Sequence, residues 1–218
     1  MAIDKDSAIE ALRSLVAEYK INSVMTFGGE PLLYPECVCE IHRTADELGI
    51  SHRQLITNGF FSKDSKRIKD VAYMVSQSRV NDVLLSVDAF HQESIPCDIV
   101  KLFAEELVKL GVPIRLSPAW LVSRQDGNTY NVKTREIVDE FTKLGIELSD
   151  GNIVFPWGNA KKYLKEYFDE DKEYINPYEE DPMNVKAVSI ECDGRIFDSN
   201  VKDENVLKIL ERYNPLAL

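Results

Sequence analysis

Basic residues are scarce in this sequence. Its 218 residues include 26 Lys and Arg against 37 Asp and Glu, which gives a formal net charge of −11. Binding to a phosphate backbone requires a basic surface, so this balance argues against non-specific binding of nucleic acid. Long apolar runs are also missing, since none approaches the ~20 residues that a membrane-spanning helix needs. The sequence therefore predicts a protein that binds neither nucleic acid nor a membrane.

Cysteine is rare as well, with four residues in the chain. The first residues include Asp4, Lys5 and Asp6 and lack the apolar core of a secretory signal. Cysteines in a chain without an export signal are typically reduced thiols. We therefore expect a cytoplasmic protein. A chain of this length can bury about 70% of its unfolded surface, so it needs no disulfide to fold.

A short phrase recurs along the chain, although no low-complexity tract does. Leu-Gly followed by Ile or Val occurs at 48–50, 110–112 and 144–146, each time after an amphipathic stretch and before an apolar one. Glycine just after a helix is the usual left-handed cap. The spacings, near one or two multiples of ~30 residues, are typical of alternating strands and helices in a βα fold.

The hydrophobic pattern predicts five strands, each of which follows a helix. The strands are almost continuously apolar, which favours an α/β fold with a parallel sheet buried on both faces. After residue 160 the sequence predicts a β-hairpin (185–191 with 195–197) and a short helix over 204–213. The earlier helices are expected over 7–19, 36–48, 64–76, 99–110 and 134–144, and the strands over 23–27, 54–57, 82–87, 113–121 and 146–155.

Polar residues, glycines and prolines follow the predicted strands at their carboxyl ends. In βα folds these ends form one rim, where ligands bind. Loops also carry such residues for purely conformational reasons, so the composition of the rim leaves both explanations open. The segments concerned are 28–31, 57–59, 86–93, 117–118 and 155–159.

The first rim segment has the most specific chemistry. Gly28 and Gly29 let a ligand approach the backbone without a Cβ in the way. The carboxylate of Glu30 can accept hydrogen bonds from an amine. This GGEP segment after an apolar strand resembles the radical S-adenosylmethionine (radical SAM) superfamily, in which GGEP ends the second strand and binds the amino group of the methionine moiety. Segments 85–88 (LSVD) with 91–93 (HQE), and 154–160 (VFPWGNA), are similar to further rim segments of that family.

The resemblance covers roughly residues 7–160 and implies a fold and a cofactor. The fold is a partial (β/α) TIM-like barrel over residues 1–160 that lacks its first strand, followed by a small α+β extension over 161–218. The cofactor is S-adenosylmethionine, which we expect this chain to bind weakly. The residues assigned to it are Gly28, Gly29, Glu30 and Pro31 near the methionine amine, Ser86 and Asp88 near the ribose or the substrate, and Thr57, Asn58, Pro156, Gly158 and Asn159 around the rest of the rim.

The chain lacks the ligands for the [4Fe–4S] cluster of the family. That cluster needs three thiolates close together, supplied by CxxxCxxC on one loop, and the cysteines here are Cys37, Cys39, Cys97 and Cys192. Residues two apart on a helix point about 200° apart, so Cys37 and Cys39 cannot share an ion. We therefore expect an S-adenosylmethionine-dependent radical enzyme only if the native gene has a cluster-bearing segment before these residues. This chain alone should perform no radical chemistry. The alternative is a degenerate, non-catalytic barrel that binds a small molecule or a partner protein.

Three further residues are candidates for contact with a small-molecule or peptide substrate. His91 and Glu93 lie at the rim, where His91 either transfers a proton or braces its loop. Arg115 lies inside a strand, and if it points inward it needs an acidic partner, for which Glu30 and Asp88 are the candidates.

The strand at 23–27 predicts an oligomer. In the family barrel its free side pairs with the first strand, and its residues include neither proline nor lysine to protect an open edge. Each unpaired buried backbone group costs ~1–3 kcal/mol, so we expect this edge to be covered. The chain's own segment 185–218 or a second copy could cover it, and we favour a homodimer.

Overall fold

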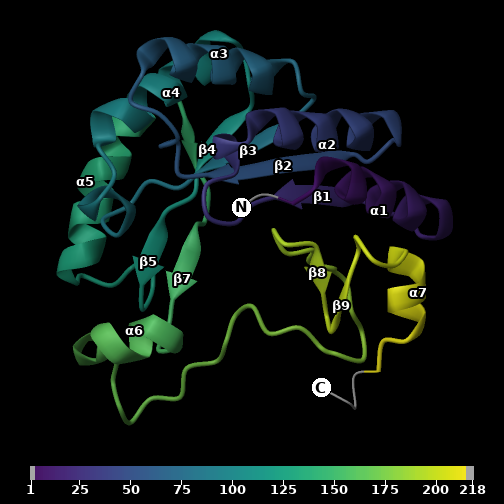
Figure 1. The fold of residues 1–218 in the computed structure, drawn as a ribbon. Coiled ribbons are helices and arrows are strands. Elements are labelled where there is room, and N and C mark those ends of the chain that lie inside the picture. The colour runs from purple at the N-terminus through teal and green to yellow at the C-terminus, as the bar shows by residue number, and fades with distance from the viewer. Residues whose placement is uncertain (1–2, 215–218) are drawn as a thin grey trace.

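A five-stranded parallel sheet forms the centre of the molecule (Figure 1). The computed structural model describes residues 3–214, so the outermost residues of the two expected domains, 1–2 and 215–218, lie outside it. The strand order is β1-β2-β3-β4-β6, and all neighbours are parallel, which confirms the predicted α/β class. The strands are β1 (Ser23–Thr26), β2 (His52–Thr57), β3 (Asp82–Leu85), β4 (Ile114–Leu116) and β6 (Glu147–Leu148).

Helices alternate with these strands, as predicted. Asp4, Asp64 and Asn128 cap α1, α3 and α5 by accepting a backbone N–H of the first turn, which satisfies a group that the helix leaves unpaired. The cap at Asn128 starts α5 five residues before the predicted residue 134. The helices are α1 (Lys5–Glu18), α2 (Pro35–Glu47), α3 (Ser65–Ser76), α4 (Cys97–Lys109) and α5 (Thr129–Thr142).

The main core lies between one face of the sheet and the helices. Alternate strand residues point to this face, and burial of each large apolar side chain contributes ~1.5–3 kcal/mol. The fully buried members include Leu55, Val83, Leu85 and Leu116 from strands, and Ile68, Val71, Val100, Phe103 and Phe141 from helices.

The opposite face of the sheet is partly exposed and polar. Met25, Gln54 and Asp82 are neighbours in register across β1, β2 and β3, and Met25 is 39% exposed. Gln54 donates to Asp82 at 2.8 Å, and Arg115 of β4 binds the same carboxylate. The expectation of a sheet buried on both faces is therefore wrong. Alternating residues of this face include the polar Gln54, Asp82 and Arg115 beside the half-buried Ile56 and Leu84, whereas a second helical layer would need apolar residues throughout.

The two last predicted strands of the sheet are interrupted. The chain bends at Pro118, which has no N–H for a ladder, and at Gly151, whose φ is +73°. A Cβ on Gly151 would lie 2.2 Å from the carbonyl oxygen of Pro118, so only glycine fits there. Beyond these bends β5 (Ala119–Leu121) and β7 (Asn152–Val154) pair with each other in a separate two-stranded sheet. The described strands therefore form open sheets, and closure of a barrel is not seen among them.

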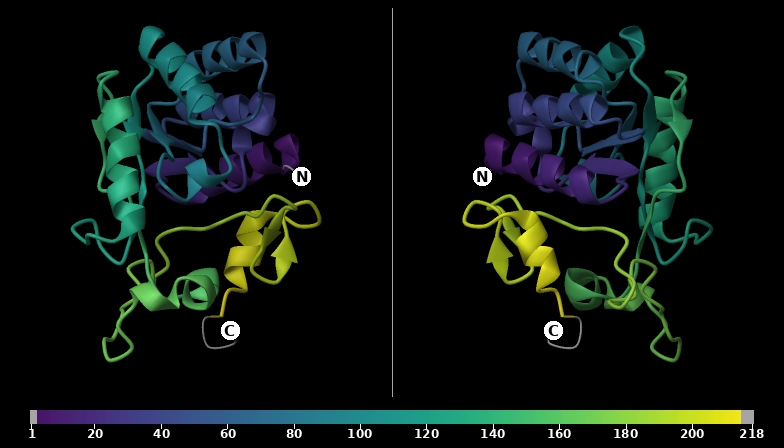
Figure 2. Two further views of the ribbon diagram at one scale, coloured as in Figure 1. Left: turned by 90° about the vertical axis from the view of Figure 1, so that its left-hand side faces the viewer. Right: turned by 90° about the vertical axis from the view of Figure 1, so that its right-hand side faces the viewer.

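The C-terminal segment returns to the first helix. Figures 1 and 2 show β8 (Arg195–Ile196), β9 (Ser199–Asn200) and α7 (Val206–Glu211) beside α1. Ile196, Val206 and Ile209 bury their side chains against Ala11 of α1. This small core joins the two ends of the chain.

The hairpin in this segment differs from the predicted one. Gly194 forms the expected turn by donating to the carbonyl of Glu191 at 2.8 Å, but residues 185–191 form no strand. Instead Arg195 and Ile196 pair with Asn200 and Ser199. None of the helices within residues 3–214 has the length and apolar character that crossing a bilayer requires.

Candidate functional site at the carboxyl ends of the strands

Glu30 lies at the β1 end of the rim, four residues after that strand ends. Its Oε1 accepts the backbone N–H of Leu32 at 2.9 Å and the hydroxyl of Thr57 at 2.7 Å. Its Oε2 accepts the backbone N–H of Asn58 at 2.9 Å. Because Thr57 and Asn58 end β2, one carboxylate joins the ends of two neighbouring strands. The structure thus brings together three of the predicted site residues.

Each carboxylate oxygen has two lone pairs, and the two oxygens of Glu30 are used unequally. Two protein donors occupy Oε1 and one occupies Oε2. Burial raises the pKa of Glu30 above its usual value, against the lowering effect of these hydrogen bonds. A cationic ligand group at Oε2 would stabilise the ionised form.

The backbone beside Glu30 is open. A Cβ placed on Gly28 or Gly29 would meet no other atom within 4 Å. Gly28 has φ +137°, a conformation that side-chain-bearing residues rarely adopt, so glycine is needed there for the backbone itself. Phe27 and Leu33 flank this segment and are 59% and 57% exposed. The rim therefore offers a carboxylate and a bare backbone beside exposed apolar side chains.

Asp88 organises the next part of the rim from within. Its side chain has no exposure to solvent. Oδ1 accepts the backbone N–H groups of Phe90 and His91, both at 3.0 Å, and Oδ2 accepts that of Ala119 at 2.9 Å. These bonds hold the loop after β3 against β5. The contact of Asp88 with a ribose or substrate stays a prediction.

His91 lies at the rim and is hydrogen-bonded to the buried Asp88. Its Nδ1 lies 2.8 Å from Oδ2 of Asp88, in the short helix η2 (His91–Glu93). This hydrogen bond raises the pKa of His91 above its usual value, with smaller contributions from the charges of Asp88 and Glu30. His91 therefore braces its loop, which is one of the two roles expected for it. Proton transfer by its other nitrogen stays a prediction, as does any substrate contact of the exposed Glu93.

Gln92 is a rim residue that the sequence did not single out. Its Oε1 accepts the backbone N–H of Asp88 at 2.9 Å, whereas its buried Nε2 has no hydrogen-bond partner. The side chain fixes the start of the loop that carries His91. The only signal for it was its place between His91 and Glu93.

Arg115 does not belong to the rim. Its Nε and Nη2 bind Asp82 at 3.0 and 2.5 Å, so Glu30 and Asp88 are wrong as its expected partners. The reason is the direction of the strand. Asp82 begins β3, and Arg115 points toward that amino end, whereas Glu30 and Asp88 follow the carboxyl ends of their strands.

The remaining predicted rim residues are dispersed. Ser86 donates its backbone N–H to the carbonyl of Thr57 at 2.8 Å and so lies beside the Glu30 network. Pro156, Gly158 and Asn159 lie near the start of α6 (Gly158–Tyr163), which Figure 1 places far from the ends of β1 and β2. No hydrogen bond joins them to Glu30 in the part of the chain that the structure describes. Their contact with a ligand stays a prediction.

The four cysteines do not form a cluster. Cys39 is buried and its pKa is raised to about 11 by burial, Cys37 and Cys97 are partly buried, and Cys192 is exposed. Within residues 3–214 no group of three or more Cys, His, Asp or Glu side chains could hold a metal ion.

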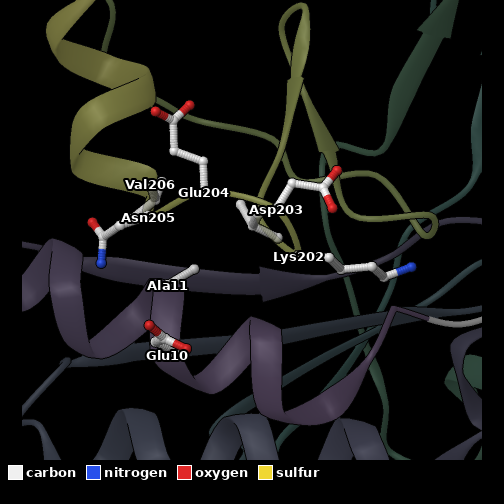
Figure 3. A pocket seen from close by; sticks show the side chains of 8 residues that line it. Glu10, Ala11, Lys202, Asp203, Glu204, Asn205 and Val206 are labelled. Atoms are coloured by element: carbon white, nitrogen blue, oxygen red, sulfur yellow. The ribbon is translucent and has the colours of Figure 1, made fainter.

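The surface also has a hollow away from the rim. A cavity of about 160 Å³ lies between α1 and the turn before α7. Figure 3 shows Glu10 on one side of it and Asp203 and Glu204 on the other. It is polar and acidic, and it contains none of the rim residues.

Comparison with known proteins gives little. No family model matches the sequence, and no curated protein matches it. Among solved structures, the chain is similar to a domain of pyruvate-formate lyase-activating enzyme from Bacteroides vulgatus ATCC 8482, with 15% identity and a TM-score of 0.40. The match covers 61% of this chain and 98% of that chain. A likeness at this level carries no conclusion about function, so the function rests on the chemistry of the rim.

Proposed function

We propose that the rim around Glu30 binds S-adenosylmethionine through the ammonium group of its methionine moiety. The observation that carries this proposal is the unequal use of the Glu30 carboxylate, whose Oε2 has a single protein donor beside an open glycine backbone. An ammonium group supplies the cation and the donors that such an oxygen binds. The GGEP segment, which resembles that of the radical SAM superfamily, favours this ligand over other amines.

The residues around Glu30 have distinct roles in this proposal. Gly28 and Gly29 leave room for the ligand against the backbone, and Glu30 orients the amine. Thr57 and Asn58 act through Glu30, because their donors fix its carboxylate. The exposed side chain of Phe27 offers apolar surface to the rest of the ligand.

A [4Fe–4S] cluster does not fit the residues described. It needs three neighbouring thiolates, whereas Cys37 and Cys39 lie on α2, Cys97 on α4 and Cys192 before β8. The proposal for these residues is therefore a binding function, and radical cleavage of S-adenosylmethionine would need thiolates from another segment. Anaerobic reconstitution with iron and sulfide should give no stable cluster, and about four irons per chain with visible absorption would contradict this.

Calorimetry with S-adenosylmethionine and S-adenosylhomocysteine tests the proposal. We expect weak but measurable binding to the unmodified chain and an affinity at least about tenfold lower for Glu30→Gln, which is a loss of ~1.4 kcal/mol. Glutamine keeps the size of the side chain and removes its charge. Glu136→Gln, an exposed acid on α5, is the matched control and should bind as the unmodified chain does. Equal affinity in all three proteins would show that Glu30 does not hold the ligand.

A further inference from the structure

Strand β1 has a free edge. It pairs with β2 alone in the described part of the chain, and the other side of the strand faces no strand. The N–H of His52 donates to the carbonyl of Asn22 at 3.1 Å, and Ser23 lies opposite His52 in register. In a parallel ladder, this pairing means that the N–H and C=O groups of Val24 and Thr26 point toward β2. The groups of Ser23, Met25 and Phe27 therefore point away from the sheet.

Strands β6 and β7 have protected edges, whereas the edge of β1 has no such protection. Strand β6 is only two residues long and carries Glu147. The edge of β7 is capped, because the hydroxyl of Tyr178 accepts the N–H of Ile153 at 2.8 Å. Residues 22–27 contain no charged residue and no proline, the usual guards of an edge. Met25 and Phe27 also expose 39% and 59% of their surface there.

Within residues 3–214, the C-terminal segment does not cover this edge. Strands β8 and β9 pair with each other, and α7 packs on α1. No backbone hydrogen bond joins residues 23–27 to residues 185–213. The sequence offered two candidates to cover this edge, the segment 185–218 and a second copy of the chain. The contacts of the described residues favour the second copy.

The free edge is complementary to itself. Its outward groups belong to residues 23, 25 and 27, which are spaced symmetrically about Met25. In an antiparallel pair related by a two-fold axis, Met25 lies opposite Met25 of the copy, and Ser23 lies opposite Phe27. Each opposed pair can then exchange two N–H···O bonds. With no charge on the segment, the pairing brings no like charges together.

We propose that two copies of this chain associate through β1, in an antiparallel pair centred on Met25, to form one sheet that runs through both. The exposed side chains of Met25 and Phe27 pack across the two-fold axis on the face that carries no helices. This interface does not depend on the ligand proposed for the rim. Since each chain carries a net charge of −11, higher salt should strengthen the dimer by screening long-range repulsion.

Light scattering at about 0.1 mM chain, a concentration that saturates a micromolar dimer, is the first test. The unmodified chain should be dimeric. Met25→Lys and Met25→Glu should each be monomeric, because each places like charges directly opposite one another. Met25 is exposed enough for both variants to fold, which thermal denaturation checks. Tyr73→Lys, at an exposed apolar residue of α3, is the control and should stay dimeric.

Mixing the two variants tests the register. The introduced lysine of one chain would face the introduced glutamate of the other, so the mixture should recover a dimer that neither variant forms alone. A monomeric unmodified chain, or dimers that survive both substitutions, would overturn the edge interface. Failure of the mixture to pair would overturn the arrangement centred on Met25.

Discussion

His91 Nδ1 lies 2.8 Å from Oδ2 of Asp88, a carboxylate with no exposure to solvent. The same Oδ2 accepts the backbone N–H of Ala119. One buried acid therefore fixes both the histidine at the rim and the distance between β3 and β5. Its charge is balanced by three backbone donors and the imidazole, which is how a fully buried carboxylate is tolerated.

Asp88→Asn should lower the pKa of His91. The hydrogen bond that His91 makes to the carboxylate of Asp88 is the largest cause of the raised pKa, and the charge of the same carboxylate adds to it. The chain has three histidines, so their proton NMR resonances can be titrated separately. Glu30→Gln should lower the same pKa by less, because Glu30 acts only through its charge. An unchanged His91 titration in Asp88→Asn would contradict the pairing.

The sequence predicted the order of helices and strands because hydrophobic period and glycine caps are local signals. It did not predict the polar cluster on the open face of the sheet, since Gln54, Asp82 and Arg115 become neighbours only through strand register. It also missed the bends at Pro118 and Gly151. These depend on the close approach of two segments that are distant in sequence.

Stability should fall as the pH is lowered from about 6.5 toward about 4 because of His42. This side chain is fully buried, and its Nε2 is 2.8 Å from the hydroxyl of Thr26. Burial, with a smaller effect of Arg53, lowers its pKa from 6.5 to about 4. Between these two values the unfolded state binds a proton that the folded state does not. The folded state therefore loses up to on the order of 3 kcal/mol across this range.

Urea unfolding at several pH values, compared with His42→Gln, isolates this effect. Glutamine can still bond to Thr26 but does not titrate. The difference in unfolding free energy between the two proteins should change with pH by up to ~1.4 kcal/mol per unit in that range and be constant above about pH 7. A difference that is constant throughout would mean that His42 is protonated equally in both states.

Val122→Gly should stabilise the protein. Val122 has φ +69°, where a β-branched side chain is strained, in a tight turn in which Ser123 donates to the carbonyl of Leu121 at 2.8 Å. Glycine removes strain of ~1–3 kcal/mol at a cost of ~1 kcal/mol in chain entropy. The urea midpoint should therefore rise. Val132→Gly on α5, at an exposed helical position, is the matched control and should lower it.

The sequence predicted the site only where consecutive residues supply its functional groups. Gly28, Gly29 and Glu30 are consecutive, so the sequence indicated both the open backbone and the carboxylate. Two of the three donors to that carboxylate come from another strand end, and the backbone donors of Asp88 come from the next loop and from β5. Short polar motifs predict where a rim lies. Which of their groups face a ligand is decided by long-range hydrogen bonds.

Asn131 is the residue whose loss should most disturb the loop after β5. Its buried side chain accepts the N–H of Leu121 at 2.8 Å and donates to the carbonyls of Leu121 and Ser123 at 3.0 and 2.8 Å. Asn131→Ala leaves these buried backbone groups unpaired, so we expect a loss of ~2–4 kcal/mol in urea unfolding. Lys133→Ala, an exposed change on the same helix, should cost little.

Asn131→Asp separates the hydrogen bonds from the shape of the side chain. It keeps the acceptor for Leu121 but turns an oxygen toward carbonyls that the amide group donated to. At neutral pH the carboxylate is charged and buried against acceptors, so Asn131→Asp should be less stable than Asn131→Ala. Protonation restores one donor, so this gap should narrow as the pH is lowered toward about 4. If the Asp variant is as stable as the unmodified chain at pH 7, the side-chain amide of Asn131 is not what holds the loop.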